Sequence, residues 1–217
     1  MMLFSLKLTG HKKWSSDLGK AFYDRRGSGP RATPVVDEGR VNMISGEGAI
    51  SCVNASNGAK VWQKKMSDFG GRTPKWGYSE SVLIYKNLAI VTPGGRQCIV
   101  ALDKKTGRKV WSSSGIGDAA HYSSCIAVTY EGVPMIIQGT ANGMYGVNPS
   151  NGRKLWSNGW PGRNTANCPT PAFSDGYVFW ANGYGKGGIC VKLTVNGGKV
   201  TAKEAWRTRD MVCHHGG

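Results

Sequence analysis

The sequence predicts an all-β protein, and three observations support this prediction. The chain of 217 residues contains 32 glycines but only 9 prolines, a composition that suits many short strands joined by tight turns. Short apolar runs separated by turn residues recur along the chain. Five tryptophans recur at intervals of 48, 49, 45 and 50 residues, at Trp14, Trp62, Trp111, Trp156 and Trp206. Together these features predict a β-propeller of four-stranded antiparallel blades, with about four complete blades and an N-terminal half-blade.

The residues that precede these tryptophans repeat as well. Four of the tryptophans have a glycine four residues earlier and a lysine two residues earlier, at Gly10, Gly58, Gly107 and Gly152 and at Lys12, Lys60, Lys109 and Lys154. Asn54, Asp103 and Asn148 stand eight residues before three of them. Glycine accepts a positive φ without a steric penalty, and Asn or Asp can bond the backbone of its own turn. The motif therefore predicts a hairpin, and we interpret the tryptophan as a packing residue at the seam between blades.

The blades follow one another in the order of the chain. Residues 1–20 supply only the third and fourth strands of a blade, and the complete blades are predicted at about 33–66, 81–112, 124–157 and 170–207. In each blade a pair of short apolar strands precedes the hairpin, as residues 33–36 and 40–44 do in the first. The last copy departs from the pattern through an insertion before Trp206.

The repeat also predicts that residues 1–217 form a single, incomplete propeller. In the earlier copies the next inner strand begins about 15–20 residues after the tryptophan, and the same distance from Trp206 passes Gly217. We therefore expect a fragment of a longer protein. A small closed ring, or two copies that complete the circle together, is the alternative. Open blade edges expose unpaired backbone groups, so self-association through them is also expected.

Composition limits the classes of function. No apolar run approaches the ~18 residues of a membrane span, and the first eight residues are too short for the apolar part of a signal peptide. The net charge is +15, but the basic residues are spread along the chain, so nucleic-acid binding is not expected and binding of acidic polymers is a weaker alternative. The six cysteines include no CxxC motif, which argues against a metal knuckle or a redox dithiol.

Candidate binding residues lie in segments that lead into the innermost strands, or that join the second and third strands, because these segments meet at one mouth of the channel. They are Trp76, Tyr78, Glu80, Arg96, His121, Tyr122, Asn167, Tyr184, Lys186, His214 and His215. Adjacent side chains in extended structure point apart, so His214 and His215 do not indicate a metal site. Glu80 and His121 could form an acid–base pair, but the sequence does not fix their separation, and no catalytic residue is assigned.

The segment Ala101-x-Asp103-x-x-x-Gly107-x-x-x-Trp111 resembles the tryptophan-docking motif of the quinoprotein-like (PQQ-like repeat) β-propellers. This family includes quinoprotein alcohol dehydrogenases and an outer-membrane assembly lipoprotein. The resemblance implies a location in the periplasm or cell envelope. Dehydrogenases of the family use a disulfide between adjacent cysteines and a calcium ion held by carboxylate and amide groups. This sequence has no adjacent cysteine pair, and no cofactor is predicted.

The resemblance is compatible with two functions, since one repeat can serve unrelated activities. The first is a non-catalytic binding or scaffold module, which presents one channel face to a protein partner or a small ligand. The alternative is a partial quinoprotein dehydrogenase that oxidises an alcohol or a sugar with PQQ and calcium.

Overall fold

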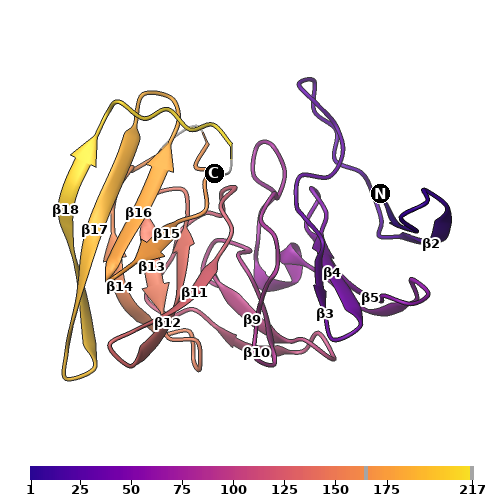
Figure 1. The fold of residues 1–217 in the computed structure, drawn as a ribbon, viewed down its shortest axis with the longest axis horizontal. Coiled ribbons are helices and arrows are strands. Elements are labelled where there is room, and N and C mark those ends of the chain that lie inside the picture. The colour runs from indigo at the N-terminus through magenta and orange to yellow at the C-terminus, as the bar shows by residue number, and fades with distance from the viewer. Residues whose placement is uncertain (164–165, 216–217) are drawn as a thin grey trace.

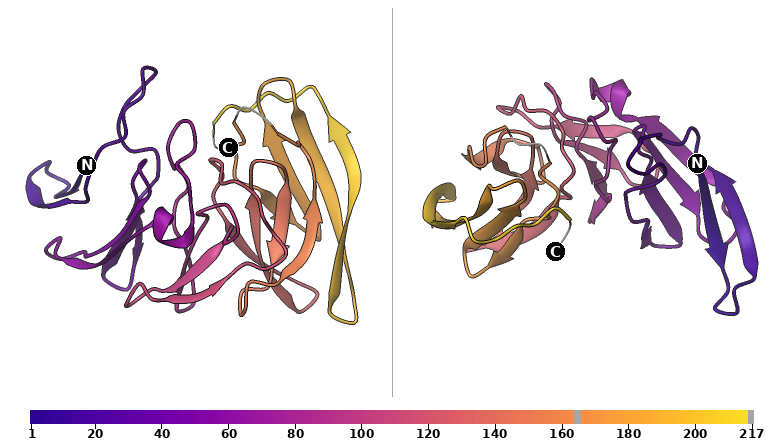
Figure 2. Two further views of the ribbon diagram at one scale, coloured as in Figure 1. Left: turned by 180° about the vertical axis from the view of Figure 1, so that it is seen from behind. Right: turned by 90° about the horizontal axis from the view of Figure 1, so that it is seen from above.

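The computed structural model describes residues 1–163 and 166–215. In this part of the chain the strands form one two-stranded and four four-stranded sheets. The sheets follow one another around an open arc, as Figure 1 and the view from above in Figure 2 show. The all-β fold, with four complete blades and an N-terminal half-blade, is therefore confirmed.

Each blade is an antiparallel meander whose neighbouring strands are consecutive in the chain. The half-blade contains β1 (Met2–Leu6) and β2 (Lys12–Asp17). The first complete blade contains β3 (Val35–Asp37), β4 (Arg40–Ile44), β5 (Ala49–Asn54) and β6 (Lys60–Lys65), and a short 3-10 helix, η1 (Met66–Phe69), follows it. The second contains β7 (Leu83–Tyr85), β8 (Leu88–Val91), β9 (Val100–Asp103) and β10 (Lys109–Ser112). The third contains β11 (Ile126–Tyr130), β12 (Val133–Gly139), β13 (Met144–Val147) and β14 (Lys154–Asn158). The fourth contains β15 (Ala172–Ser174), β16 (Tyr177–Asn182), β17 (Gly187–Asn196) and β18 (Lys199–Thr208).

Burial differs between the middle and the outer strands of a blade. In β5 and β8 most residues are buried. In β6 only Trp62 is buried, and most of the other residues are exposed. The middle strands pack against neighbouring blades on both faces, so both sets of alternating side chains are apolar. The outermost strand faces water, and its buried residue is the one that reaches the next blade. The hydrophobic core therefore lies in the seams between blades.

The tryptophans join each blade to the next one. The Trp62 indole N–H donates to the Lys104 carbonyl at 3.0 Å, and its ring lies so close to Gly107 that a Cβ there would sit 2.8 Å away. Gly107 has a φ of +70°, which favours glycine. The equivalent pairs repeat this contact: Trp14 with Ala55 and Gly58, and Trp111 with Pro149 and Gly152. Three successive seams thus share one docking geometry.

The last two tryptophans differ from this pattern. Trp156 is buried, but its indole N–H points to the Met135 sulfur of its own blade at 3.4 Å. Trp206 is 49% exposed and lies against Phe179 of its own sheet. The assignment of Trp206 as a docking residue is therefore wrong for the described residues. Among the described residues no blade follows β18, so the Trp206 ring has no turn on which to dock. For Trp156 the reason is the insertion, which lengthens β17 and β18 to ten residues each and replaces the compact turn on which its ring would dock.

The described cysteines are all free, and Cys52, Cys98, Cys125 and Cys190 are buried, where a thiol packs as a small apolar group. Among the helices of the described residues, none is long and apolar enough to cross a membrane.

Candidate functional site

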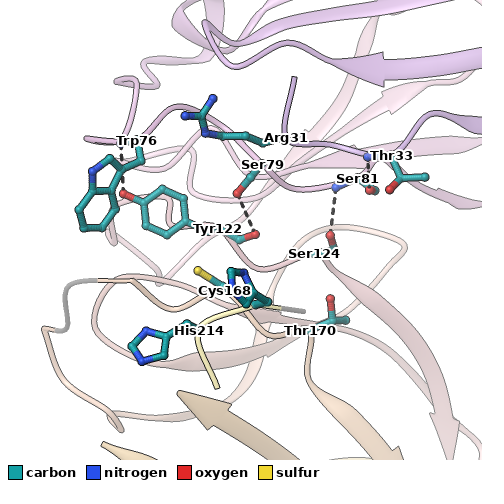
Figure 3. Close-up of a pocket in the computed structure, with 11 residues that line it drawn as sticks. Arg31, Thr33, Trp76, Ser79, Ser81, Tyr122, Ser124, Cys168, Thr170 and His214 are labelled. Atoms are coloured by element: carbon teal, nitrogen blue, oxygen red, sulfur yellow. Dashed lines mark hydrogen bonds between the residues drawn. The ribbon is translucent and has the colours of Figure 1, made fainter. Parts of the chain in front are cut away.

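Where the four complete blades converge, the arc carries a cavity of about 540 Å³, which we call the mouth pocket. The segments that precede the innermost strands of the four blades meet there, together with the C-terminal segment (Figure 3). The pocket is lined by Arg31, Thr33, Trp76, Ser79, Ser81, Tyr122, Ser124, Cys168, Thr170, His214 and His215. The lining combines hydroxyl groups, aromatic rings and a guanidinium group.

The hydroxyl groups lie at one equivalent position in the four blades. Thr33, Ser81, Ser124 and Thr170 each stand shortly before the innermost strand. The Thr33 N–H donates to the Ser81 hydroxyl at 3.1 Å, and the Ser81 N–H donates to the Ser124 hydroxyl at 3.0 Å. A hydroxyl that accepts one hydrogen bond still has its own proton to donate. These two bonds therefore hold the first three blades at a fixed spacing, and the hydroxyl groups supply donors to the mouth pocket.

Trp76 and Tyr122 form the aromatic wall of the mouth pocket. Their ring centroids lie 5.8 Å apart, and the Trp76 N–H donates to the Tyr122 hydroxyl oxygen at 3.4 Å. The Ser79 hydroxyl donates to the Tyr122 carbonyl at 3.1 Å, and the Tyr122 N–H donates to the Asn167 carbonyl. Burial raises the pKa of Tyr122, so its hydroxyl stays protonated at neutral pH. Bonds between successive blades therefore hold this wall in place.

The predicted histidines take different positions. His214 and His215 line the mouth pocket from the C-terminal segment, whereas His121 is half-buried beside it and stacks on Tyr122 at 4.9 Å. Its Nδ1 accepts the Asn167 N–H at 3.2 Å. Burial lowers the pKa of His121, so the ring is neutral at pH 7. His121 thus orients the next segment.

Tyr78 and Glu80 do not lie at the mouth, which corrects the sequence prediction. After the turn that ends at Gly77, the side chains of residues 78–81 alternate between the core and the mouth pocket. Ser79 and Ser81 face the mouth pocket. Tyr78 and Glu80 face the core, where they are only 1% and 2% exposed. The Tyr78 hydroxyl donates to the Pro93 carbonyl at 3.0 Å, and burial raises its pKa.

Glu80 lies in a buried polar network between the second and third blades. Its Oε1 accepts the Thr92 N–H at 2.5 Å, and its Oε2 accepts a Gln138 side-chain N–H at 3.4 Å. The same Gln138 amide group donates to the Thr92 hydroxyl at 2.6 Å and to the Ser123 carbonyl at 3.0 Å. Burial raises the pKa of Glu80 to about 7, and the Thr92 bonds oppose the shift. This carboxyl group stabilises a seam and is enclosed away from the mouth pocket.

Asn167 and Arg96 also lie outside the mouth pocket. Asn167 is fully buried, and its amide nitrogen donates to the carbonyls of Thr140 and Ala141 at 2.7 and 3.2 Å. Arg96 is exposed on the turn between β8 and β9. The prediction that these two side chains lie at the mouth is therefore wrong.

Tyr184 and Lys186 line a second cavity of about 400 Å³, which we call the rim pocket. The Tyr184 ring meets the His214 ring edge to face at 4.4 Å, so the rim pocket adjoins the mouth pocket. The last residues of the predicted mouth segment, Gly216 and Gly217, lie outside the described residues.

Arg31 is a lining residue that was not predicted from the sequence. Its guanidinium group donates to the carbonyls of Gly27 and Gly29 at 2.6 and 2.9 Å and packs over the Phe22 ring at 4.8 Å. It stands four residues before the innermost strand of the first complete blade, the position that Ser79, Tyr122 and Cys168 hold in the other three blades. The blade spacing is therefore a signal that could have indicated Arg31. The four hydroxyl residues were not among the predicted site residues either, although they recur at the blade spacing.

Comparison with known proteins gives the context of this site. The model of the family described as outer membrane protein assembly factor BamB matches residues 5–216. The curated quinoprotein alcohol dehydrogenase PedH of Pseudomonas putida is 26% identical over 209 residues, which cover 87% of this chain and 30% of that protein. This chain therefore spans less than a third of the length of that relative.

Solved structures show the same fold. BamB from Moraxella catarrhalis superposes with a TM-score of 0.66 at 15% identity, covering 99% of this chain and 60% of that one. Quinohemoprotein alcohol dehydrogenase from Comamonas testosteroni superposes with a TM-score of 0.59 at 11% identity, covering 96% of this chain and 40% of that one. With the family match over residues 5–216, the chain belongs to the PQQ-like β-propeller family described as outer membrane protein assembly factor BamB.

Proposed function

We propose that this chain is a non-catalytic scaffold module of the periplasm or cell envelope that binds a partner protein at its mouth pocket. The observation that carries the proposal is the lining of that pocket. Tyr122, Trp76 and Arg31 stand around one concave surface, and Tyr, Trp and Arg dominate the binding energy of protein interfaces. The description of the family as an assembly factor supports the same function.

The mouth pocket is also preorganised. The Thr33–Ser81 and Ser81–Ser124 bonds and the contact between Trp76 and Tyr122 all join different blades. A surface whose side chains are already fixed loses little conformational entropy on binding. Rigidity of this kind supports a docking surface.

The chemistry of the mouth pocket supports binding over catalysis. Its described lining residues include no carboxylate. Glu80 is enclosed in the core, and His121 is engaged by the Asn167 N–H. A general acid–base pair must reach the substrate within hydrogen-bond distance, and the enclosed Glu80 does not meet this requirement.

A second candidate is the partial dehydrogenase with PQQ and calcium, which the likeness to PedH favours. Calcium prefers six to eight oxygen ligands, many of them carboxylate oxygens. Among residues 1–163 and 166–215, no group of three or more His, Cys, Asp or Glu side chains could hold a metal ion. Glu80 is bonded within a seam, and the Asn167 amide group is fully buried. The residues that the structure describes do not fit a calcium site.

Photo-crosslinking tests the scaffold function. Benzoylphenylalanine introduced at Ser79 or Thr170, in the mouth pocket, is expected to capture the same envelope protein from both positions. The control is Val110, which is 54% exposed on the outer strand β10 and is expected to capture none. The double variant Trp76→Ala, Tyr122→Ala should reduce co-purification of the captured protein about tenfold or more, because it removes the aromatic wall.

Two results would contradict the scaffold function. One is capture of the same proteins from Val110 as from the mouth positions. The other is dye-linked oxidation of an alcohol by the purified chain after PQQ and Ca²⁺ are added, with the activity lost in the Trp76→Ala, Tyr122→Ala variant.

A further inference from the structure

The rim pocket has a positively charged lining. Its lining comes from the loop before residue 163, from the turn between β16 and β17, and from the end of β18. The lining residues are Trp160, Pro161, Tyr184, Gly185, Lys186, Arg207 and Arg209. Three of these seven residues are cations, and the described lining includes no carboxylate. Three like charges around one cavity repel one another unless an anion lies among them.

We propose that the rim pocket binds an acidic segment of a partner protein, through the carboxylate groups of Asp or Glu side chains. This inference rests on the proposed scaffold function and names the chemistry of the segment that the partner presents. The occupant is a protein segment because the cations converge in a concave pocket of about 400 Å³, whereas a long polyanion is held by cations spread along an extended groove.

The cations are placed to receive carboxylate groups. The Lys186 ammonium group donates to the Pro161 carbonyl at 3.2 Å, which fixes its position, and an ammonium group has two further N–H donors. Arg207 pairs with Glu204 at 2.6 Å on the exposed strand, and Arg209 stands two residues further along the chain. Arginine binds carboxylates through two parallel hydrogen bonds. With Glu204 counted, the rim pocket keeps an excess of two positive charges.

The aromatic residues of the rim pocket fit the same occupant. The Tyr184 side chain is 51% exposed, and the buried Trp160 is braced by Trp180, with ring centroids 6.0 Å apart. Interfaces are enriched in Tyr, Trp and Arg side chains relative to the rest of a protein surface. Through the contact between Tyr184 and His214, the rim pocket continues into the mouth pocket. One partner can therefore cover both pockets.

Fluorescence anisotropy with a labelled hexaglutamate peptide tests this proposal. The triple variant Lys186→Gln, Arg207→Gln, Arg209→Gln is expected to weaken peptide binding about tenfold or more. The matched control, Lys13→Gln, Arg108→Gln, Arg153→Gln, removes the same number of lysines and arginines from exposed positions elsewhere. The control should weaken binding by about twofold or less, through net charge alone. Unfolding curves of both variants establish that they fold.

Three outcomes would overturn the proposal. Equal losses in the two triple variants would show that the peptide responds only to the overall charge of +15. If inorganic polyphosphate binds more tightly than hexaglutamate, and the triple variant Lys186→Gln, Arg207→Gln, Arg209→Gln loses this binding, the pocket is a phosphate site. If the peptide does not bind while crosslinking at Ser79 and Thr170 is intact, the proposal of an acidic segment is excluded and the scaffold function is unaffected.

Discussion

Replacing Trp111 by alanine is expected to lower the free energy of unfolding by about 3–5 kcal/mol, as is typical when a buried aromatic side chain is truncated. The indole ring is 7% exposed, it packs on Gly152 of the next blade, and its N–H donates to the Pro149 carbonyl at 2.8 Å. Its loss leaves a cavity in the seam and removes a buried hydrogen bond. Urea unfolding at equilibrium, followed by circular dichroism, measures the change.

Trp206→Ala is the matched control for this substitution. The same residue type stands there at the equivalent repeat position, but it is half exposed and docks on no following blade among the described residues. We expect a loss of about 1 kcal/mol or less, the ordinary range for an exposed position. A loss from Trp206→Ala as large as that from Trp111→Ala would contradict the docking role.

Glu80→Gln is expected to become more stable relative to the wild type as the pH rises. The difference in unfolding free energy above pH 7 should exceed the difference in acid by about 3 kcal/mol, because the folded-state pKa of Glu80, about 7, exceeds the ordinary value of 4.5. The raised pKa means that the folded state favours the protonated carboxyl group. The stability that this group contributes is therefore fully present below pH 4.5 and is lost as the pH rises towards 7. Glutamine stays neutral, so the variant lacks this loss.

Urea unfolding of the wild type and of Glu80→Gln at several pH values between about 4 and 8.5 measures the effect. The difference in unfolding free energy should grow in favour of the variant across this range and level off above pH 7. Glu47→Gln removes one exposed carboxylate and is the matched control. Parallel pH profiles for the wild type and Glu80→Gln would contradict the buried, proton-binding role of Glu80.

The repeat made the fold predictable from the sequence. The spacing of Gly107 and Trp111 predicts a turn with positive φ, a following strand and an indole ring that reaches the next blade. The local backbone preference and the contact between blades therefore favour the same structure at these residues. Trp206 has the same spacing to the previous repeat, but its role depends on a following blade. The insertion before Trp206 was the signal in the sequence that this copy departs from the docking pattern.

The candidate site was only partly predictable. The repeat showed which segments meet at the mouth, and Trp76, Tyr122, His214 and His215 do line that pocket. It did not show which side of an extended segment faces the cavity. Neighbouring side chains of such a segment face opposite sides, so a prediction that is wrong by one residue assigns every side chain to the wrong side. Ser79 lines the pocket, whereas Glu80, its neighbour, lies in the core.

The central claim is that the indole rings of Trp14, Trp62 and Trp111 join their blades to the next one. Hydrogen exchange of the indole N–H groups, followed by NMR, tests it most directly. The account predicts that the N–H groups of Trp62 and Trp111, which donate to Lys104 and Pro149, exchange at least about tenfold more slowly than that of Trp206. Exchange of all three at the rate of a free indole, or equal protection of Trp206, would contradict it.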